Sequence, residues 1–220
     1  MLLNELSVEF DLLYNNISSN QAPGLTEYEK SVFLTQAQEA VILDLYKGTS
    51  GDAFETTEEV TRYLSSLVKI NYPDDDDVKV LQSTKEGMNM YAYVLPDDVW
   101  FVTYQSGSIT IGDKPEDKPR DVIVVPSRQD SLYKDLNNPF KGPNKNKVLA
   151  ISEEGSIILY SKYPINTFYI KYLKRPNPIV LDKSELEING VSDFNVEIPE
   201  SLHNQVLYKA VQLAKAVWQS

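Results

Sequence analysis

The sequence predicts an α+β protein in which helices from both ends of the chain form a bundle, with an antiparallel β module inserted between them. Three observations support this prediction. Apolar residues recur at helical spacing in residues 1–70, the dominant period changes to two between residues 78 and 181, and helical spacing returns near residue 198. The expected units are therefore residues 1–70 with 198–220, and residues 71–197.

The first two helices follow from apolar spacing and from one capping signal. Apolar side chains recur every three or four residues and so share one helical face: Leu2, Leu3, Leu6, Phe10, Leu13, Tyr14 and Ile17. Pro23 and Gly24 break that helix. Thr26 and Glu29 match a capping box, in which each side chain satisfies a free backbone N–H of the other residue. A second helix is therefore expected to start here and to end at Gly48.

Two further helices are expected, one on each side of the β module. Thr56 and Glu59 repeat the capping pattern and precede the apolar stripe Val60, Leu64, Leu67 and Val68. In the last stretch, Pro199 stands near the start of a helix, where its missing N–H costs little. The apolar positions that follow recur at helical spacing: Leu202, Val206, Ala210, Leu213 and Val217.

The middle of the chain reads as strands that are rich in β-branched and aromatic residues. The expected strands lie at 88–96, 99–105, 108–111, 121–125 and 168–181, and residues 147–161 read as a hairpin. A long polar loop at 127–147 carries at most one helical turn, near 132–136. No stretch approaches the roughly 18 apolar residues that a membrane span requires. The N-terminus also lacks the basic segment of a secretory signal, so we expect a soluble protein.

No catalytic, cofactor or metal site is expected. With no Cys and one His, the chain excludes thiolate nucleophiles, iron–sulfur clusters and zinc sites built on several Cys or His residues. A Ser-His-Asp triad would depend on His203, which follows the apolar position Leu202 and is expected to be an exposed polar residue. Neither a nucleophile elbow nor a phosphate-binding glycine loop is present.

Two charged loops are candidate interface sites. The acidic loop contains the run Asp74, Asp75, Asp76 and Asp77. Carboxylates can bind Ca²⁺, but this spacing does not match an EF-hand loop, so a solvated loop is favoured. The basic loop contains Lys141, Lys145 and Lys147. In a chain with a net charge of −11, it can pair with acidic surfaces of another copy.

The 14 tyrosines favour a protein–protein interface, with ordinary packing within the sheet as the alternative. They alternate or cluster in the expected strands at Tyr91, Tyr93, Tyr104, Tyr160, Tyr163, Tyr169 and Tyr172. A platform for stacking nucleic-acid bases would also need a positive groove. The acidic composition argues against such a groove and against general binding to phosphate backbones.

Several segments resemble ring proteins from the head–tail connector of short-tailed bacteriophages, especially crAss-like phages. The resemblance spans nearly the whole chain, and its segments occur in matching order: LNELSVEFDLLYNN with ISSNQAPGLTEYEKSVFLTQAQEAVILDLY, NNPFKGP, YIKYLKRPNPIVL and IPESLHNQVLYKAVQLAKA. It implies an adaptor or head-completion (tail-tubular-type) protein of the virion, made in the host cytoplasm. Such proteins form a twelvefold ring beneath the portal and contact neighbouring ring or tail proteins.

The resemblance further implies that the genome passes through a central channel without specific binding. If the net negative charge lines that channel, it repels DNA phosphates, so the polymer slides. Residues 73–77 and 127–147 are then expected to be docking arms that order against portal or tail neighbours. Two other functions remain open: an acidic, DNA-mimicking inhibitor, and a glycan hydrolase with two carboxylates about 5–9 Å apart.

Overall fold

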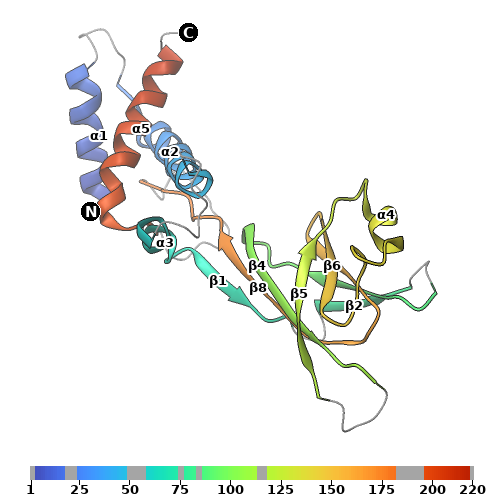
Figure 1. Ribbon diagram of the computed structural model, residues 1–220. Coiled ribbons are helices and arrows are strands. Elements are labelled where there is room, and N and C mark those ends of the chain that lie inside the picture. Colours follow the sequence, from blue (N-terminus) through green and yellow to red (C-terminus); the bar gives the residue numbers. More distant parts are fainter. Residues whose placement is uncertain are drawn as a thin grey trace. The chain divides into compact units, whose positions relative to one another are not determined.

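The computed structural model describes residues 3–17, 24–48, 58–73, 77–82, 86–112, 118–181 and 196–218. The chain divides into a helical unit, Met1–Leu67 with Arg175–Ser220, and a sheet unit, Val68–Lys174 (Figure 1). The α+β class is confirmed. The boundaries of the two units differ from those expected, because residues 68–70 belong to a strand and residues 175–181 lie with the helices.

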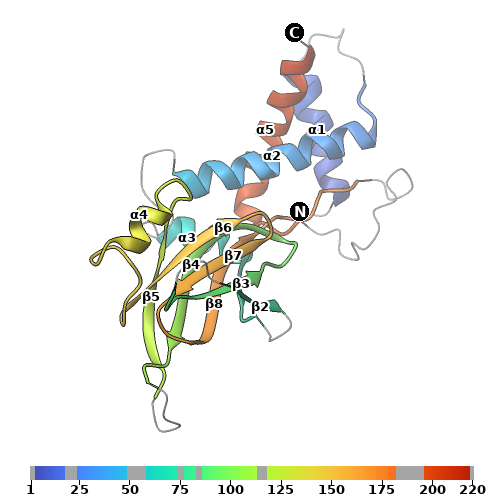
Figure 2. The same ribbon diagram turned by 90° about the vertical axis from the view of Figure 1, so that its right-hand side faces the viewer.

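The helical unit is built from α1 (Leu3–Ile17), α2 (Glu27–Lys47), α3 (Glu58–Leu64) and α5 (Glu200–Trp218). Helix α5 contacts both α1 and α2, and α2 crosses the other two helices (Figures 1 and 2). The buried side chains of these three helices include Leu6, Phe10, Leu34, Ile42, Leu202, Val206, Leu207 and Ala210. The unit therefore joins both ends of the chain in one core. Among the described residues, no helix is both long and apolar enough to cross a bilayer.

The capping box expected at the start of α2 is confirmed. The backbone N–H of Glu29 donates to Thr26 Oγ1 over 3.2 Å, and the backbone N–H of Thr26 donates to Glu29 Oε2 over 2.8 Å. The second capping pattern begins at Thr56, which lies outside the described residues.

A buried lysine links α1 to α2. Lys30 is only 4% exposed, and its Nζ lies 2.6 Å from Asp11 Oδ2, 3.0 Å from Glu27 Oε1 and 3.3 Å from Ser7 Oγ. Burial alone would lower the pKa of Lys30, but the hydrogen bonds and charges of Asp11 and Glu27 outweigh it and raise that pKa above its usual value. The ammonium thus stays charged inside the bundle because two carboxylates surround it.

The segment that follows the sheet unit runs along a polar row on α2. The hydroxyl of Thr35 accepts from the backbone N–H of Ile179 over 3.0 Å, and Gln38 Nε2 donates to the carbonyl of Asn177 over 3.1 Å. These contacts satisfy backbone groups that no strand partner reaches. The backbone N–H of Leu181 likewise donates to Ser31 Oγ over 3.0 Å, so the buried polar side chains of Ser31 and Gln38 on α2 both have partners in this segment.

The sheet unit contains one eight-stranded sheet in the order β1-β8-β4-β5-β6-β7-β3-β2. Its strands are β1 (Val68–Asn71), β2 (Val78–Leu81), β3 (Asn89–Val94), β4 (Val99–Ile109), β5 (Arg120–Pro126), β6 (Lys147–Glu153), β7 (Ser156–Ser161) and β8 (Ile165–Lys174). The hairpin expected at 147–161 is confirmed as β6 and β7.

The sheet is mixed, which corrects the expected antiparallel module. Strands β5 and β6 pair in parallel, from Ile123 with Lys147 to Pro126 with Ala150. The connection between them, residues 127–146, carries the chain back to the start of the next strand and contains α4 (Leu132–Asn137). We call this connection the crossover loop; its helix is the turn expected near 132–136.

Both faces of the sheet contribute to apolar clusters. The larger cluster includes Tyr93, Ile109, Val122, Val148, Ile157, Leu159, Phe168, Ile170 and Tyr172. The smaller one lies on the opposite face of β6 and β7, around Leu149, Ile151 and Ile158, and is covered by Leu132 and Leu136 of the crossover loop. The crossover loop is therefore anchored to the sheet by its apolar side chains.

Candidate functional site

The charged residues singled out from the sequence fall in two places. Asp74, Asp75 and Asp76 lie outside the described residues, while Asp77 is half-buried directly before β2. Lys141, Lys145 and Lys147 lie at the end of the crossover loop and the start of β6. Among the described residues, no group of three or more His, Asp or Glu side chains could hold a metal ion.

The backbone of the crossover loop is fixed by its own hydrogen bonds. Asn138 Oδ1 accepts from the backbone N–H of Phe140 over 2.8 Å and from that of Lys141 over 3.2 Å. Lys147 Nζ donates to the carbonyl of Phe140 over 3.0 Å, and the N–H of Gly142 donates to the carbonyl of Asn138 over 2.7 Å. The loop is therefore held by hydrogen bonds within a single chain, and its docking against portal or tail neighbours stays a prediction.

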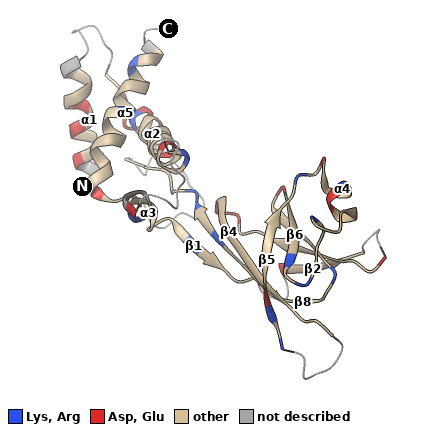
Figure 3. Cartoon of the chain, viewed as in Figure 1, with Lys and Arg blue, Asp and Glu red and all other residues tan. Residues whose placement is uncertain are grey.

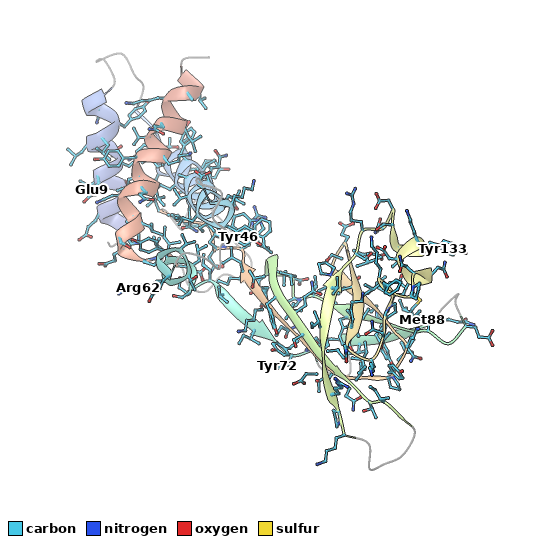
Figure 4. The ribbon with its side chains drawn as sticks, viewed as in Figure 1. Glu9, Tyr46, Arg62, Tyr72, Met88 and Tyr133 are labelled. Atoms are coloured by element: carbon cyan, nitrogen blue, oxygen red, sulfur yellow. The ribbon has the colours of Figure 1, made fainter. Side chains whose placement is uncertain are left out.

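Two aromatic side chains project from this ordered loop. Tyr133 is 82% exposed and Phe140 is 89% exposed. Figure 4 shows Tyr133 pointing away from the sheet on α4. Lys141 and Lys145 beside Phe140 are exposed, and Lys141 Nζ lies 3.9 Å from Asp135 Oδ1. The loop thus presents large apolar groups flanked by positive charge.

A cleft, which we call the β4 cleft, lies where β4 and β5 separate. Their pairing covers only Ser106–Ile109 of β4, so Val99–Gln105 extend beyond it, and the register of β4 against β8 is irregular near Trp100 and Thr103. The cleft has a volume of about 610 Å³. Its lining includes Leu95, Val99, Trp100, Phe101 and Val102 from one side and Pro126, Ser152 and Gly155 from the other.

Acidic and unpaired polar groups surround this apolar cleft. Asp97 lines it and is exposed, and the exposed Glu153 and Glu154 lie in the β6–β7 turn beside it. Gln105 also lines the cleft, and its Oε1 is buried without a hydrogen-bond partner among the described residues. A buried acceptor of this kind is unusual in a folded protein, and a water molecule or a donor from another molecule can satisfy it.

Asp98, next to the cleft, is held by partners of its own unit. Lys69 Nζ lies 2.7 Å from Asp98 Oδ2, and the hydroxyl of Tyr172 donates to Asp98 Oδ1 over 3.0 Å. Burial alone would raise the pKa of Asp98, but Lys69 and Tyr172 lower it below its usual value. Burial, together with the charge of Asp98, raises the pKa of Tyr172 to about 12. This network joins β1, β8 and the turn before β4, and so supports one wall of the cleft.

The tyrosines divide between core and surface. Tyr93, Tyr160 and Tyr172 are buried in the apolar clusters, so for them the packing alternative is correct. The ring of Tyr169 packs at a tilt against the rings of Tyr72 and Tyr104, with ring centroids 5.3 and 6.0 Å apart. Tyr72 and Tyr104 are exposed, and Lys171 Nζ lies 5.7 Å from the centre of the Tyr104 ring. Of the tyrosines named from the sequence, Tyr104 has the exposure expected of an interface residue, and Tyr169 is half-buried beside it.

The expectation that His203 is exposed is wrong. Its side chain is buried at 4% exposure, and its Nε2 lies 3.1 Å from the carbonyl oxygen of Ile198. That contact places a hydrogen on Nε2, and Nδ1 is buried without a hydrogen-bond partner among the described residues. The contact ties the side chain of His203 to the segment just before α5.

The helical unit also exposes apolar side chains. Val8 and Leu12, one turn apart on α1, are exposed on a helix that also carries Glu5, Glu9 and Asp11 (Figure 3). A groove of about 400 Å³ follows α2, with Tyr28 and Val32 on one side and Pro178 on the other. Apolar ridges of this kind on a folded unit are typical of protein–protein contacts.

Comparison with known proteins gives a consistent result along the full chain. Residues 1–220 match the family described as "Phage tail ring protein 3/4". The chain is 37% identical to "Ring protein 3" of Bacteroides phage crAss001, over 97% of this chain and 95% of the relative. It is 30% identical to "Ring protein 4/5" of the same phage, over 100% of this chain and 94% of the relative. The chain therefore belongs to the phage tail ring protein 3/4 family and is a ring protein of the crAss-like phage type.

Proposed function

We propose that copies of this chain form a closed ring in the connector between capsid and tail, and that the phage genome passes through the central channel of this ring. The match to a ring-protein family over the whole length of the chain carries the proposal. In this role the chain acts by assembly, and no catalytic step is assigned to it.

The described surfaces support head-to-tail assembly. A cyclic ring of identical copies uses two different faces of each copy, one toward each neighbour. The sheet unit offers such a pair: the crossover loop with Phe140 and its lysines, and the apolar cleft with Asp97 at its mouth. Opposite charge on the two faces orients neighbouring copies in one direction.

The net charge of −11 per copy supports a channel that DNA does not adhere to. DNA-binding surfaces neutralise phosphates with Lys and Arg, whereas a negative wall repels them. We propose that acidic residues line the channel. A ring structure with Lys and Arg along the channel wall would overturn this part of the proposal.

The two relatives support a ring that has related rings as neighbours. Both come from one phage and carry the names of different ring proteins, Ring protein 3 and Ring protein 4/5. We propose that this chain forms a twelvefold ring that stacks against a ring of a related chain, below the portal protein. Neighbouring copies, the portal and the next ring or tail protein are then its partners in the virion neck.

The proposal is tested by mass and by imaging. The purified chain, alone and mixed with the portal protein of its phage, is examined by native mass spectrometry and negative-stain microscopy. Twelvefold rings, either alone or on the portal, are the expected result. A chain that stays monomeric at high concentration and ignores the portal would overturn the proposal, as would its absence from the neck of the virion.

A further inference from the structure

We propose that Phe140 of each copy inserts into the β4 cleft of the next copy, with Lys141 facing Asp97 of that neighbour. This inference rests on the proposed ring and assigns its contact between copies. The inserted residue and the receiving cleft both belong to the sheet unit, at different places on its surface. Because the two surfaces differ, repeating the contact adds one copy after another in the same direction, and the series closes into a ring when the rotation between neighbours adds up to a full turn.

Phe140 has the properties of an anchor residue. It is 89% exposed, although leaving a whole aromatic ring in water is unfavourable for an isolated chain. Its backbone N–H and carbonyl are both held, by Asn138 Oδ1 over 2.8 Å and by Lys147 Nζ over 3.0 Å. Because the backbone around the ring is already ordered, insertion loses little further conformational freedom, which is a feature of strong anchors.

Gly142 lets the backbone of the crossover loop pass close to the end of α4. A Cβ atom at this position would lie 2.8 Å from the carbonyl oxygen of Asn138 and 3.2 Å from that of Asp135. Only glycine therefore lets the chain pass this close to the end of α4. The geometry keeps Phe140 at the tip of the crossover loop, with Lys141 directly after it.

The β4 cleft has the properties of a receiving site. Its volume of about 610 Å³ is within the range of about 300–1,000 Å³ that is typical of pockets for ligands. Leu95, Val99 and Val102 supply apolar walls, and the rings of Trp100 and Phe101, 5.0 Å apart, offer partners for an entering phenyl ring. Gln105 Oε1 supplies a buried acceptor that a donor from the entering loop can satisfy.

Charge gives the contact a direction. Lys141 and Lys145 flank the inserted ring, and the cleft carries Asp97, with Glu153 and Glu154 in the adjacent turn. The contact of Lys141 with Asp135 of its own loop is long, at 3.9 Å, and leaves the lysine exposed for a partner. Within one copy Phe140 is exposed, so it does not fill its own cleft. A second copy of the chain supplies both the apolar surface and the opposite charge.

Cross-linking tests the contact directly. The chain has no Cys, so a pair introduced as Lys141→Cys and Ser152→Cys keeps the Phe140 side chain and forms disulfides only among the introduced positions, and peptide mapping identifies the 141–152 link. Ser152 lines the cleft and is exposed, so its replacement disturbs no core. Under oxidising conditions we expect a ladder of dimers, trimers and larger products up to the full ring. The control pair Val80→Cys with Ser152→Cys, which uses an exposed position outside the crossover loop, should give no ladder.

The outcomes separate this inference from the proposed function. Rings that form, as judged by native mass, but give no more ladder than the control overturn the inference alone. A chain that forms no ring, alone or with portal, overturns both. A third outcome is that rings survive loss of the Phe140 side chain but no longer bind portal or a related ring chain. Phe140 would then contact that other protein and not the next copy, which would also overturn the inference.

Substitutions provide a second, independent test. Phe140→Ser should raise the concentration needed for half-assembly about thirtyfold, as for loss of a typical anchor residue, without changing thermal unfolding of the monomer. Val80→Ser should leave assembly unchanged. Lys141→Glu and Asp97→Lys should each weaken assembly, and both changes in one chain should restore most of it. Failure of the paired charge reversal to recover assembly would contradict the assigned contact.

Discussion

Replacing Lys30 with Met tests whether the buried charge cluster joins α1 to the rest of the helical unit. Lys30 Nζ lies 2.6 Å from Asp11 on α1 and 3.0 Å from Glu27 on its own helix. The substitution keeps most of the apolar volume and removes the charge. It leaves two carboxylates close together without the cation that neutralises them, so α1 should detach more easily.

The expected loss of stability follows from how buried each partner is. Removing one partner of a fully buried ion pair costs about 3–5 kcal/mol, because the remaining charge is left without compensation. Here Lys30 is buried, but the side chains of Asp11 and Glu27 are 45% and 42% exposed, so water screens part of their charge. We therefore expect Lys30→Met to lower the free energy of unfolding by about 2 kcal/mol.

Urea unfolding followed by circular dichroism at the helical band measures this loss, because the cluster lies in the helical unit. The matched control is Lys209→Met, since Lys209 Nζ lies 3.4 Å from Asp44 in an exposed pair between α5 and α2. The control should cost less than about 0.5 kcal/mol. Adding Asp11→Asn and Glu27→Gln to Lys30→Met should recover part of the loss. Equal effects of Lys30→Met and Lys209→Met would refute the reasoning.

The sign of the pH dependence provides a further check on the same variant. The pKa of Lys30 is raised in the folded state, so its contribution is complete below the ordinary lysine pKa of about 10.4 and is lost as the pH rises through the raised value. The difference between wild type and Lys30→Met should therefore be constant near neutral pH and shrink only in strong alkali. A difference that disappears between pH 7 and pH 9 would contradict this origin.

Three other single changes have defined outcomes. The pKa of Tyr172 is about 12, so the unfolded chain loses this proton near pH 10 while the folded chain keeps it, and stability should fall between about pH 10 and 12. Tyr172→Phe should cost about 1 kcal/mol at pH 7 and reduce that alkaline fall in urea titrations. Gly142→Ala should weaken ring assembly in the half-assembly assay, because its Cβ would meet the carbonyl of Asn138; unchanged assembly would show that the position of the loop is unimportant. Thr26→Ala should lower helical stability in urea by about 1 kcal/mol, and a neutral result would mean that the capping box contributes nothing.

Features set by nearby residues were predictable from the sequence. The capping box of Thr26 and Glu29 joins residues three apart, and the hairpin at 147–161 joins neighbouring strands across a short turn. The helical turn near residues 132–136 was likewise expected and is α4. In each case the deciding contacts lie within a few residues, so composition and spacing record them directly.

The error at His203 has a physical reason. A single apolar row through Leu202, Val206 and Ala210 predicted a helix with one buried stripe. Helix α5 instead contacts both α1 and α2, so it buries a second, adjacent row that includes His203, Leu207 and Val211. The width of a buried stripe depends on how many neighbours a helix has, and spacing within the helix does not report that number.

The candidate surfaces could be predicted only in part. The basic loop was visible in the sequence as clustered lysines. The exposure of Phe140, however, depends on two hydrogen bonds of its backbone, one to Asn138 Oδ1 and one from Lys147 Nζ, and no sequence pattern predicts them. The cleft depends on where β4 separates from β5, and on the parallel pairing that brings Pro126 near the β6–β7 turn. Pairing between strands that are far apart in the sequence decides both features, and local sequence patterns do not report such pairing.

The pairing of β1 with β8 has a consequence for how this kind of protein can diversify. The first and last strands of the sheet unit lie next to each other, with Val68 opposite Leu173, so the polypeptide enters and leaves that unit at adjacent points. A segment with adjacent ends can be excised, replaced or grafted onto another scaffold with a short connection in its place. Recombination at these two adjacent points exchanges the entire sheet unit and leaves the helices of the parent intact, which gives ring proteins a simple route to new surfaces on one helical scaffold.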